Sequence, residues 1–331
     1  MEIVRPRRVF EIVDEALRHY RQRFRDFFVL FLPVGAASIV STAASLWASP
    51  YFVEDNFASF FDVAFALTAL LLSVVLVVGL QLLAYGGAIL MAGADLAGRP
   101  MTSRAAWTGA QERFFALLGS AFVFMLPVMA LALVFLVAAI AVQFSAFILI
   151  FVFLLFLALI FLFVRWALQT PSLLLEPMAV VAAFTRSWDL SRGQFWRAFG
   201  AFTLVLLLVG IITGVASSVS EGLPGLVEAG LLEATPTYWV FYVLAVLVTA
   251  ALEVATAPLV AIFWTHFYVD LRIRREGLDI TNRISALESA AGSEPPAEPP
   301  VAPPPGSPPG PPSAPPPPSI PPPPPPSGPT S

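Results

Sequence analysis

The chain has 331 residues, of which 58% are hydrophobic and 12% are charged, whereas soluble domains carry about 25% charged residues. This composition excludes an ordinary water-soluble globule and predicts a membrane protein. The chain has no cysteine, which excludes a disulfide framework, a thiolate nucleophile and a Cys-ligated metal site. We expect no metal and no cofactor. The net charge of −4 argues against nucleic-acid binding, which favours a basic surface.

The N-terminal residues predict an amphipathic helix. Apolar residues recur at spacings of three and four, which places them on one helical face: Val9, Val13, Leu17, Tyr20, Phe24 and Phe27. Arg18, Arg21 and Arg25 occupy the other faces. We expect residues 1–26 to lie in the headgroup layer and to run straight into the first span. The acid-containing 26-residue leader and the long apolar run are not typical of a cleaved signal peptide.

Six apolar runs are long enough to cross a bilayer, which takes about 20 helical residues. They cover residues 27–49, 63–93, 114–142, 144–168, 198–220 and 238–266. The third and fourth come from one uncharged run, which we divide at a turn near Gln143 and Ser145. Three spans contain a proline that predicts a kink, namely Pro33, Pro127 and Pro258. The expected fold class is an all-α polytopic membrane protein with a six-span domain over residues 27–285.

The arginines predict the orientation of these spans. All 18 basic residues are arginines, and they lie before the first span, after the second, after the fourth and after the sixth. The other three connections contain only acidic residues or no charge at all. Because positive residues near spans stay on the cytoplasmic side, both termini are predicted to be cytoplasmic.

Two further interfacial helices are predicted, from Pro177 to Phe199 with an interruption near Gly193, and from Pro100 to Phe115. Like the N-terminal helix, each precedes a pair of spans and ends in an aromatic and charged motif, so the chain contains either three copies of one unit or three independent solutions to the same need. Eight side chains of these three predicted interfacial helices are candidate contacts for anionic lipid, or simple interfacial anchors. These are Arg18, Arg21, Arg25, Arg186, Trp188, Arg192, Trp196 and Arg197.

Glu253 lies near the middle of the sixth span, where an ionised carboxylate costs on the order of 3 kcal/mol. We therefore expect it to be neutral, paired or facing water. The candidate partners are Gln81 and Tyr85 of the second span, and Thr249 and Thr256 on the same side of its own helix. The group is either a proton or cation site in a polar cavity, or a protonated carboxyl bonded between helices. His266, at the inner end of the same span, is interpreted as an interfacial or hydrogen-bonded residue.

Residues 286–331 form a separate region. Twenty-two of the chain's 32 prolines lie between Pro295 and Pro329, so this tail cannot bury a core and is predicted to be disordered, with polyproline II character. It is either a ligand for an aromatic-lined groove on a protein partner or a spacer.

Three segments resemble the bacterial glycerophosphoryl diester phosphodiesterase membrane-domain family. They are RPRRVFEIVDEALRHYRQRF near the N-terminus, PSLLLEPMAVVAAFTRSWDLSRGQFWRAFG in the centre and APLVAIFWTHFYVDLRIRREGLDI after the sixth span. The matching positions in the second and third segments are Glu176, Arg186, Ser187, Trp188, Arg192, Gly193, Trp196, Tyr268, Asp270, Leu271, Arg272, Arg274, Glu276, Gly277 and Asp279. The resemblance implies an uncharacterised multi-span protein of the bacterial cytoplasmic membrane. It does not imply phosphodiester hydrolysis, because the connections are too short for a catalytic barrel of about 250 residues.

No nucleotide-binding loop, H-E-x-x-H pair or nucleophile elbow is present, so we expect no enzymatic activity. The leading hypothesis is a membrane scaffold or accessory protein that engages lipids or protein partners at the cytoplasmic face. The alternative is a small transporter or lipid-handling protein that uses the Glu253 region. The scaffold predicts tight apolar packing and dependence on the tail, whereas the alternative predicts that Glu253 and Gln81 line one cavity. The sequence leaves the substrate, the partner and the oligomeric state open.

Overall fold

A computed structural model describes residues 8–48, 60–141, 146–176, 178–231, 233 and 235–276. The proline-rich tail and the turn expected near Gln143 lie outside these residues. All regular elements in the described part of the chain are helices, which confirms the all-α prediction. They are α1 (Val9–Gln22), α2 (Phe24–Ala48), α4 (Phe60–Leu96), α5 (Ser103–Glu112), α6 (Phe114–Ala141), α7 (Ala146–Trp166), α8 (Gln169–Leu175), α9 (Val180–Ser191), α10 (Phe195–Glu228) and α11 (Pro236–Glu276).

Six of these helices, α2, α4, α6, α7, α10 and α11, are long and apolar enough to cross a membrane, as predicted. Their large apolar side chains are exposed over much of their length; on α4, Leu71 and Leu72 are each 64% exposed. A soluble protein would bury such a surface. The exposed apolar surface therefore agrees with a multi-span membrane protein whose spans face lipid.

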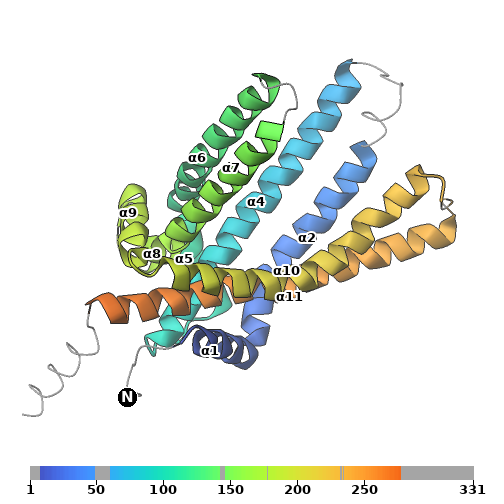
Figure 1. The fold of residues 1–331 in the computed structure, drawn as a ribbon. Coiled ribbons are helices and arrows are strands. Elements are labelled where there is room, and N and C mark those ends of the chain that lie inside the picture. Colours follow the sequence, from blue (N-terminus) through green and yellow to red (C-terminus); the bar gives the residue numbers. More distant parts are fainter. Residues whose placement is uncertain are drawn as a thin grey trace, which may run out of the picture. The chain divides into compact units, whose positions relative to one another are not determined.

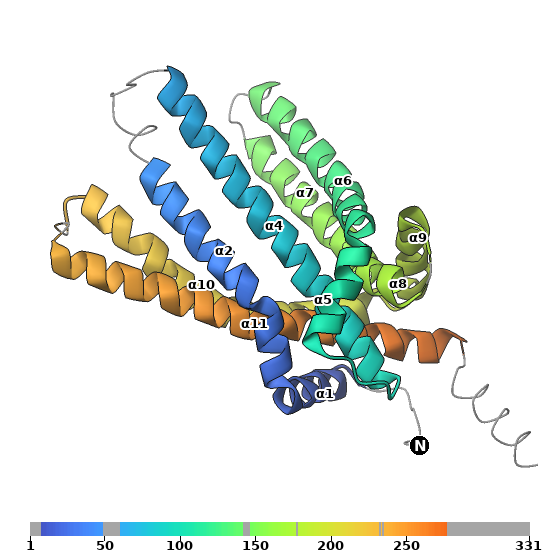
Figure 2. The ribbon, with the colours of Figure 1, turned by 180° about the vertical axis from the view of Figure 1, so that it is seen from behind.

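The spans form three antiparallel hairpins, α2 with α4, α6 with α7 and α10 with α11 (Figures 1 and 2). The described arginines lie on the short helices or at the adjoining ends of the spans, and we call this end of the domain the arginine end. Helix α11 contacts α1, α2, α4, α8, α9 and α10. From the arginine end the hairpins diverge toward the opposite ends of the spans, which we call the far end (Figures 1 and 2).

A short helix precedes each hairpin and joins it at an elbow that is followed by a phenylalanine. The elbow is one non-helical residue in the first two units and three residues, 192–194, in the third. The elbow residues have nearly the same backbone angles: Arg23 has φ −123° and ψ 28°, Arg113 φ −105° and ψ 13°, and Gln194 φ −120° and ψ 18°. The N-terminal helix therefore ends at Gln22. The prediction that it runs straight into the first span is wrong. The apolar stripe continued across this break, so periodicity alone did not reveal it.

Two of the elbows also use their side chains in the same way. Arg23 donates to the carbonyl oxygen of Met101 at 2.7 Å, and Arg113 donates to that of Leu173 at 2.9 Å. Each arginine thus holds the chain segment that leads into the next unit. The third elbow has Gln194 in this position. These parallels favour three copies of one helix-plus-hairpin unit over three unrelated solutions.

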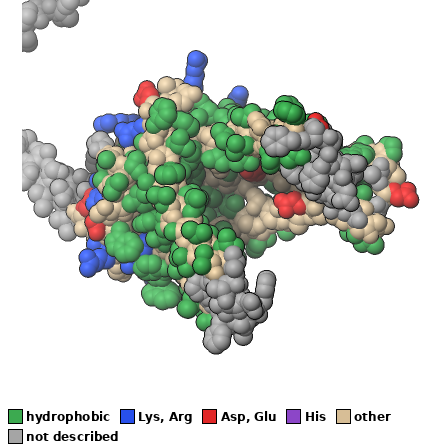
Figure 3. All heavy atoms as spheres, turned by 90° about the horizontal axis from the view of Figure 1, so that it is seen from above, with side chains coloured by type: hydrophobic (Ala, Val, Ile, Leu, Met, Phe, Trp, Pro, Cys, Tyr) green, Lys and Arg blue, Asp and Glu red, His purple; other side chains and the backbone are tan. Residues whose placement is uncertain are grey.

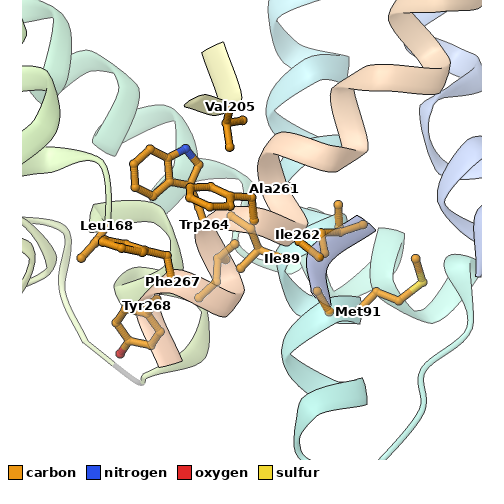
Figure 4. Close-up of a cluster of buried hydrophobic side chains, with 14 of the residues drawn as sticks. Ile89, Met91, Leu168, Val205, Ala261, Ile262, Trp264, Phe267 and Tyr268 are labelled. Atoms are coloured by element: carbon orange, nitrogen blue, oxygen red, sulfur yellow. The ribbon is translucent and has the colours of Figure 1, made fainter. Parts of the chain in front are cut away.

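The densest core lies at the arginine end, where all three units meet around α11 (Figure 4). Phe263, Phe267 and Tyr268 of α11 are buried, as are Phe27 of α2 and Met91 of α4. Phe267 stacks on Phe263, with ring centroids 5.9 Å apart. Because the hairpins separate beyond this core, the arginine end positions everything else in the domain.

Candidate functional site

Glu253 is held by a contact between α2 and α11. Its Oε2 accepts a hydrogen bond from the Ser38 hydroxyl at 3.0 Å. The two helices approach closely at Gly35, one turn away from Ser38. A side chain added at Gly35 would overlap the Val254 side chain. Glycine thus allows the backbone contact that brings Ser38 within reach of the carboxylate.

A cavity of about 410 Å³ opens beside this pair, between α2, α10 and α11. We call it the Glu253 cavity. None of the described residues that line it is basic, and they supply six hydroxyl groups and two carboxylates. The lining consists of Ser38, Ile39, Thr42, Ser45, Leu46, Ser220, Glu221, Pro224, Tyr242, Val246, Thr249, Ala250 and Glu253. A view from above shows the molecule hollowed between its apolar arms, with acidic atoms at the edge of the hollow (Figure 3).

The cavity extends from mid-span toward the far end. Glu253 lies near the middle of α11, whereas Tyr242 lies two turns from its first residue, Pro236, at the far end. Glu221 lies near the end of α10 that faces the same side. Thr249 ties the two helices together by donating to the carbonyl oxygen of Ala216 at 3.1 Å. The site is therefore a polar recess between apolar helices.

The predicted partners of Glu253 have different places in the structure. Thr249 lines the same cavity, but Thr256 donates to the carbonyl oxygen of Leu252 at 2.7 Å, within its own helix. Gln81 and Tyr85 are not among the lining residues, so the prediction that Glu253 and Gln81 line one cavity is wrong. The buried Oε1 of Gln81 has no hydrogen-bond partner in the described part of the chain.

Sequence reasoning missed Ser38. A signal for it existed in the first span, because Ser38, Thr42 and Ser45 are spaced four and three residues apart and so share one helical face. What the spacing could not show is that this face meets α11 rather than lipid.

Helix α1 contacts α11 on the other side of Glu253, near Pro258. The Tyr20 hydroxyl donates to the carbonyl oxygen of Ala255. Proline lacks an N–H and disturbs the hydrogen bonds of the preceding turn, and Ala255, to which Tyr20 donates, lies in that turn. Burial raises the pKa of Tyr20 to about 12.

A second polar cluster brings the two histidines together. His19 Nδ1 lies 3.1 Å from His266 Nε2, and His19 Nε2 lies 2.9 Å from a carboxylate oxygen of Asp95. Arg23 also binds Asp95, at 2.6 Å. A cavity of about 380 Å³ adjoins these groups and includes Glu15 in its lining. Sequence reasoning treated the histidines as separate, because 247 positions divide them and neither carries a local motif.

A third cluster joins the central and closing segments of the family resemblance. Arg186 pairs with both Glu176 and Glu276, and Arg272 pairs with the same two carboxylates at 3.2 and 3.0 Å. The Tyr268 hydroxyl donates to Glu176. Partial burial alone would raise the pKa of Glu176, but this hydrogen bond and the two arginines outweigh it and lower the pKa. These residues lock the chain before α9 onto the end of α11.

The candidate lipid contacts divide into two groups. Three of them bind other side chains of the protein. Arg186 pairs with Glu176 and Glu276, and Arg197 pairs with Asp270 at 2.7 Å. The Trp188 ring lies against the Arg165 guanidinium, whose Cζ is 4.8 Å from the ring centroid. Arg18 is largely exposed and pairs with Asp14 on its own helix. The exposed group that remains consists of Arg21, Arg25, Arg192 and Trp196.

Comparison of the chain with family models, with curated proteins and with solved structures gave no match. Within the described residues, no group of three or more His, Asp or Glu side chains is arranged to hold a metal ion. The site must therefore be interpreted from its own chemistry.

Proposed function

We propose that this chain is a lipid-handling membrane protein whose Glu253 cavity admits the polar head group of an amphiphile. The observation that carries the proposal is a cavity with two carboxylates and six hydroxyls, set between helices with apolar outer surfaces. An amphiphile matches this arrangement, since its head group would occupy the polar recess while its acyl chains stay against the apolar helices.

The charges of the cavity select the kind of head group. Glu221 and Glu253 face it without a basic residue among the described lining, so a bare phosphate would be repelled. An ammonium group would be attracted, and hydroxyl groups would find both donors and acceptors. The expected ligand is an amphiphile with an amine-bearing head group.

This proposal takes up the transport or lipid-handling alternative rather than a pure scaffold. A scaffold has no need for a carboxylate beside a cavity at mid-span, where the desolvation cost is on the order of 3 kcal/mol. The arginine partition favours a cytoplasmic arginine end, with which the cavity would open toward the outer leaflet. Membership of the bacterial glycerophosphoryl diester phosphodiesterase membrane-domain family, the lack of enzymatic activity and a partner for the tail stay predictions.

The test is lipid binding by the full-length chain in nanodiscs, measured by native mass spectrometry. We expect phosphatidylethanolamine, which carries an amine, to be retained at least about tenfold better than phosphatidylglycerol, which does not, a difference of about 1.4 kcal/mol. Glu253→Gln should remove most of that preference. Ser73→Ala is the matched control, because Ser73 is a buried span hydroxyl bonded to Ser41 rather than to the cavity.

Equal retention of the two lipids by the unaltered chain would overturn the head-group assignment. A preference that Glu253→Gln leaves unchanged would overturn the assignment of the cavity as the binding site.

A further inference from the structure

The two histidines of the chain form a linear relay with one carboxylate, at the seam between α1, α4 and α11. His19 uses both ring nitrogens, one toward Asp95 at 2.9 Å and the other toward His266 at 3.1 Å. The imidazole planes of the two histidines are nearly perpendicular, at 81°. His266 is 5% exposed, and the side chains of His19 and Asp95 are 12% and 13% exposed.

Hydrogen-bond chemistry limits how many protons this relay can hold. An N···N contact of 3.1 Å needs one N–H between the rings and one lone pair to accept it. When both histidines are neutral, His266 can donate to His19 while His19 donates to Asp95. One added proton makes His19 a donor on both sides, with His266 accepting through Nε2. A second added proton places two N–H groups and two positive charges against each other, and the contact must open.

Two carboxylates lie close to the pair. Asp95 accepts from His19 directly, and Glu15 of α1 lines the adjoining cavity. Arg23 is paired with Asp95 and also with Asp26 of α2.

The remaining basic groups nearby are also paired. Arg18 of α1, which lines the cavity, pairs with Asp14. One turn beyond His266 on α11, Asp270 is paired with Arg197 of α10 and with Arg274. Each of these arginines thus has a carboxylate, and the cavity lets water bring protons to His19.

We propose that the His19–His266 pair is a binding site for one proton, and that uptake of a second proton releases α1 from α11. The pair links these two helices, as does the Tyr20 hydroxyl on Ala255. Its opening therefore removes a polar contact that holds α1 against α11. This inference is independent of the lipid proposal, because it uses no residue of the Glu253 cavity.

Nuclear magnetic resonance of the imidazole nitrogens tests the proton count directly, because the chain has only two histidines. The full chain, purified with a tag that contains no histidine and labelled with ¹⁵N-histidine, is titrated in nanodiscs. We expect two protonation steps separated by at least about one pH unit, as for coupled groups, and one step in His266→Gln. Two coincident steps in the unaltered chain would overturn the proposal. So would Zn²⁺ that shifts both rings at one equivalent, since it would assign the pair to a metal.

Release of α1 is measured separately by spin-label distances, which the absence of native cysteine makes possible. Labels at Phe10→Cys on α1 and Ala105→Cys on α5 occupy exposed positions. We expect one narrow distance distribution at pH 7.5 and a broad one at pH 5. In His266→Gln, whose amide oxygen can accept from protonated His19, the narrow distribution should persist at pH 5.

Gln22→Ala is the matched control, since Gln22 lines the same cavity outside the relay and its variant should behave like the unaltered chain. A distribution that does not change with pH in the unaltered chain would overturn the release of α1, whatever the variants do.

Discussion

The arginine end and the far halves of the three hairpins are built from the same apolar helices, yet they differ in how those helices are held. At the arginine end, aromatic side chains are buried around α11 and the charges are bound in clusters that cross between elements. Toward the far end the hairpins diverge (Figure 1), and a polar cavity lies between two of them.

This difference shows where a membrane protein can obtain stability and where it can place a site. Burial from lipid provides little hydrophobic driving force, so span association depends on packing and polar contacts. The arginine end has both. The far halves have fewer, which leaves room for a ligand between the hairpins. The comparison predicts that equivalent substitutions have unequal effects in the two regions.

The largest effect is expected from Phe267→Ala at the arginine end. Phe267 is fully buried, and its truncation should lower the free energy of unfolding by about 3 kcal/mol through the cavity it leaves. Leu72→Ala on α4 should have almost no effect, because Leu72 is 64% exposed and loses only lipid contacts. Thermal unfolding in detergent compares the two variants. Similar losses from both would mean that the arginine end is not the stabilising core.

The next effect concerns the cluster around Glu176. Arg186→Ala leaves Glu176 and Glu276 facing each other with one arginine fewer, and should cost about 2 kcal/mol, reduced from the value for a fully buried pair because the side chain is 28% exposed. Arg18→Ala, which breaks an exposed pair on one helix, should cost about 0.3 kcal/mol.

A second substitution checks the cause of the Arg186 effect. Adding Glu276→Gln to Arg186→Ala removes one of the two carboxylates that are left to share Arg272, and should recover part of the lost stability. If the double variant is no more stable than the single one, the loss comes from packing rather than from charge.

A smaller effect is expected at the helix contact beside the Glu253 cavity. Gly35→Ala forces a methyl group into the Val254 side chain and should cost about 1 to 2 kcal/mol through overpacking. Gly79→Ala on α4 places the same methyl in open space, so the unfolding midpoint should stay the same or rise. Both are read by thermal unfolding, and a loss at position 79 equal to that at position 35 would contradict the close contact of α2 with α11.

The smallest effect is a pH dependence at the arginine end. The pKa of Glu176 is lowered in the folded protein by Tyr268, Arg186 and Arg272, against the opposing effect of burial. Its ionised form therefore contributes stability above the unfolded pKa of about 4.3, and this contribution is lost as the pH falls through the lower folded pKa.

The free energy of unfolding, measured between pH 3 and pH 7, should therefore fall more steeply at the acid end in the unaltered chain than in Glu176→Gln. The expected difference is about 1 kcal/mol, because the group is partly exposed. Parallel curves for the two proteins would show that Glu176 makes no such contribution.

Much of the fold could be predicted because its signals are local. Six apolar runs of sufficient length became six helices, with Phe114–Ala141 and Ala146–Trp166 on either side of the expected division. The short helices before the hairpins were also expected. The elbow at Arg23 was not, because the apolar stripe from Tyr20 to Phe27 continues across it while the backbone turns.

The site could be predicted only in part. Glu253 stood out because a carboxylate at mid-span is costly, and Thr249 was a reasonable neighbour because it lies one turn away on the same helix. Ser38 and Glu221, which share the cavity, lie on other helices. The pairing of His19 with His266 depends likewise on how α1 docks against α11.

The sequence by itself determined the six spans, their grouping by charge and the cost of Glu253, because hydropathy, helix length and charge act through neighbours along the chain. Only the tertiary structure decided which helices meet, and therefore which groups face a cavity, which arginines are already paired and which histidines lie in contact. These outcomes depend on close backbone contacts such as that at Gly35, whose partner Val254 is more than two hundred residues away.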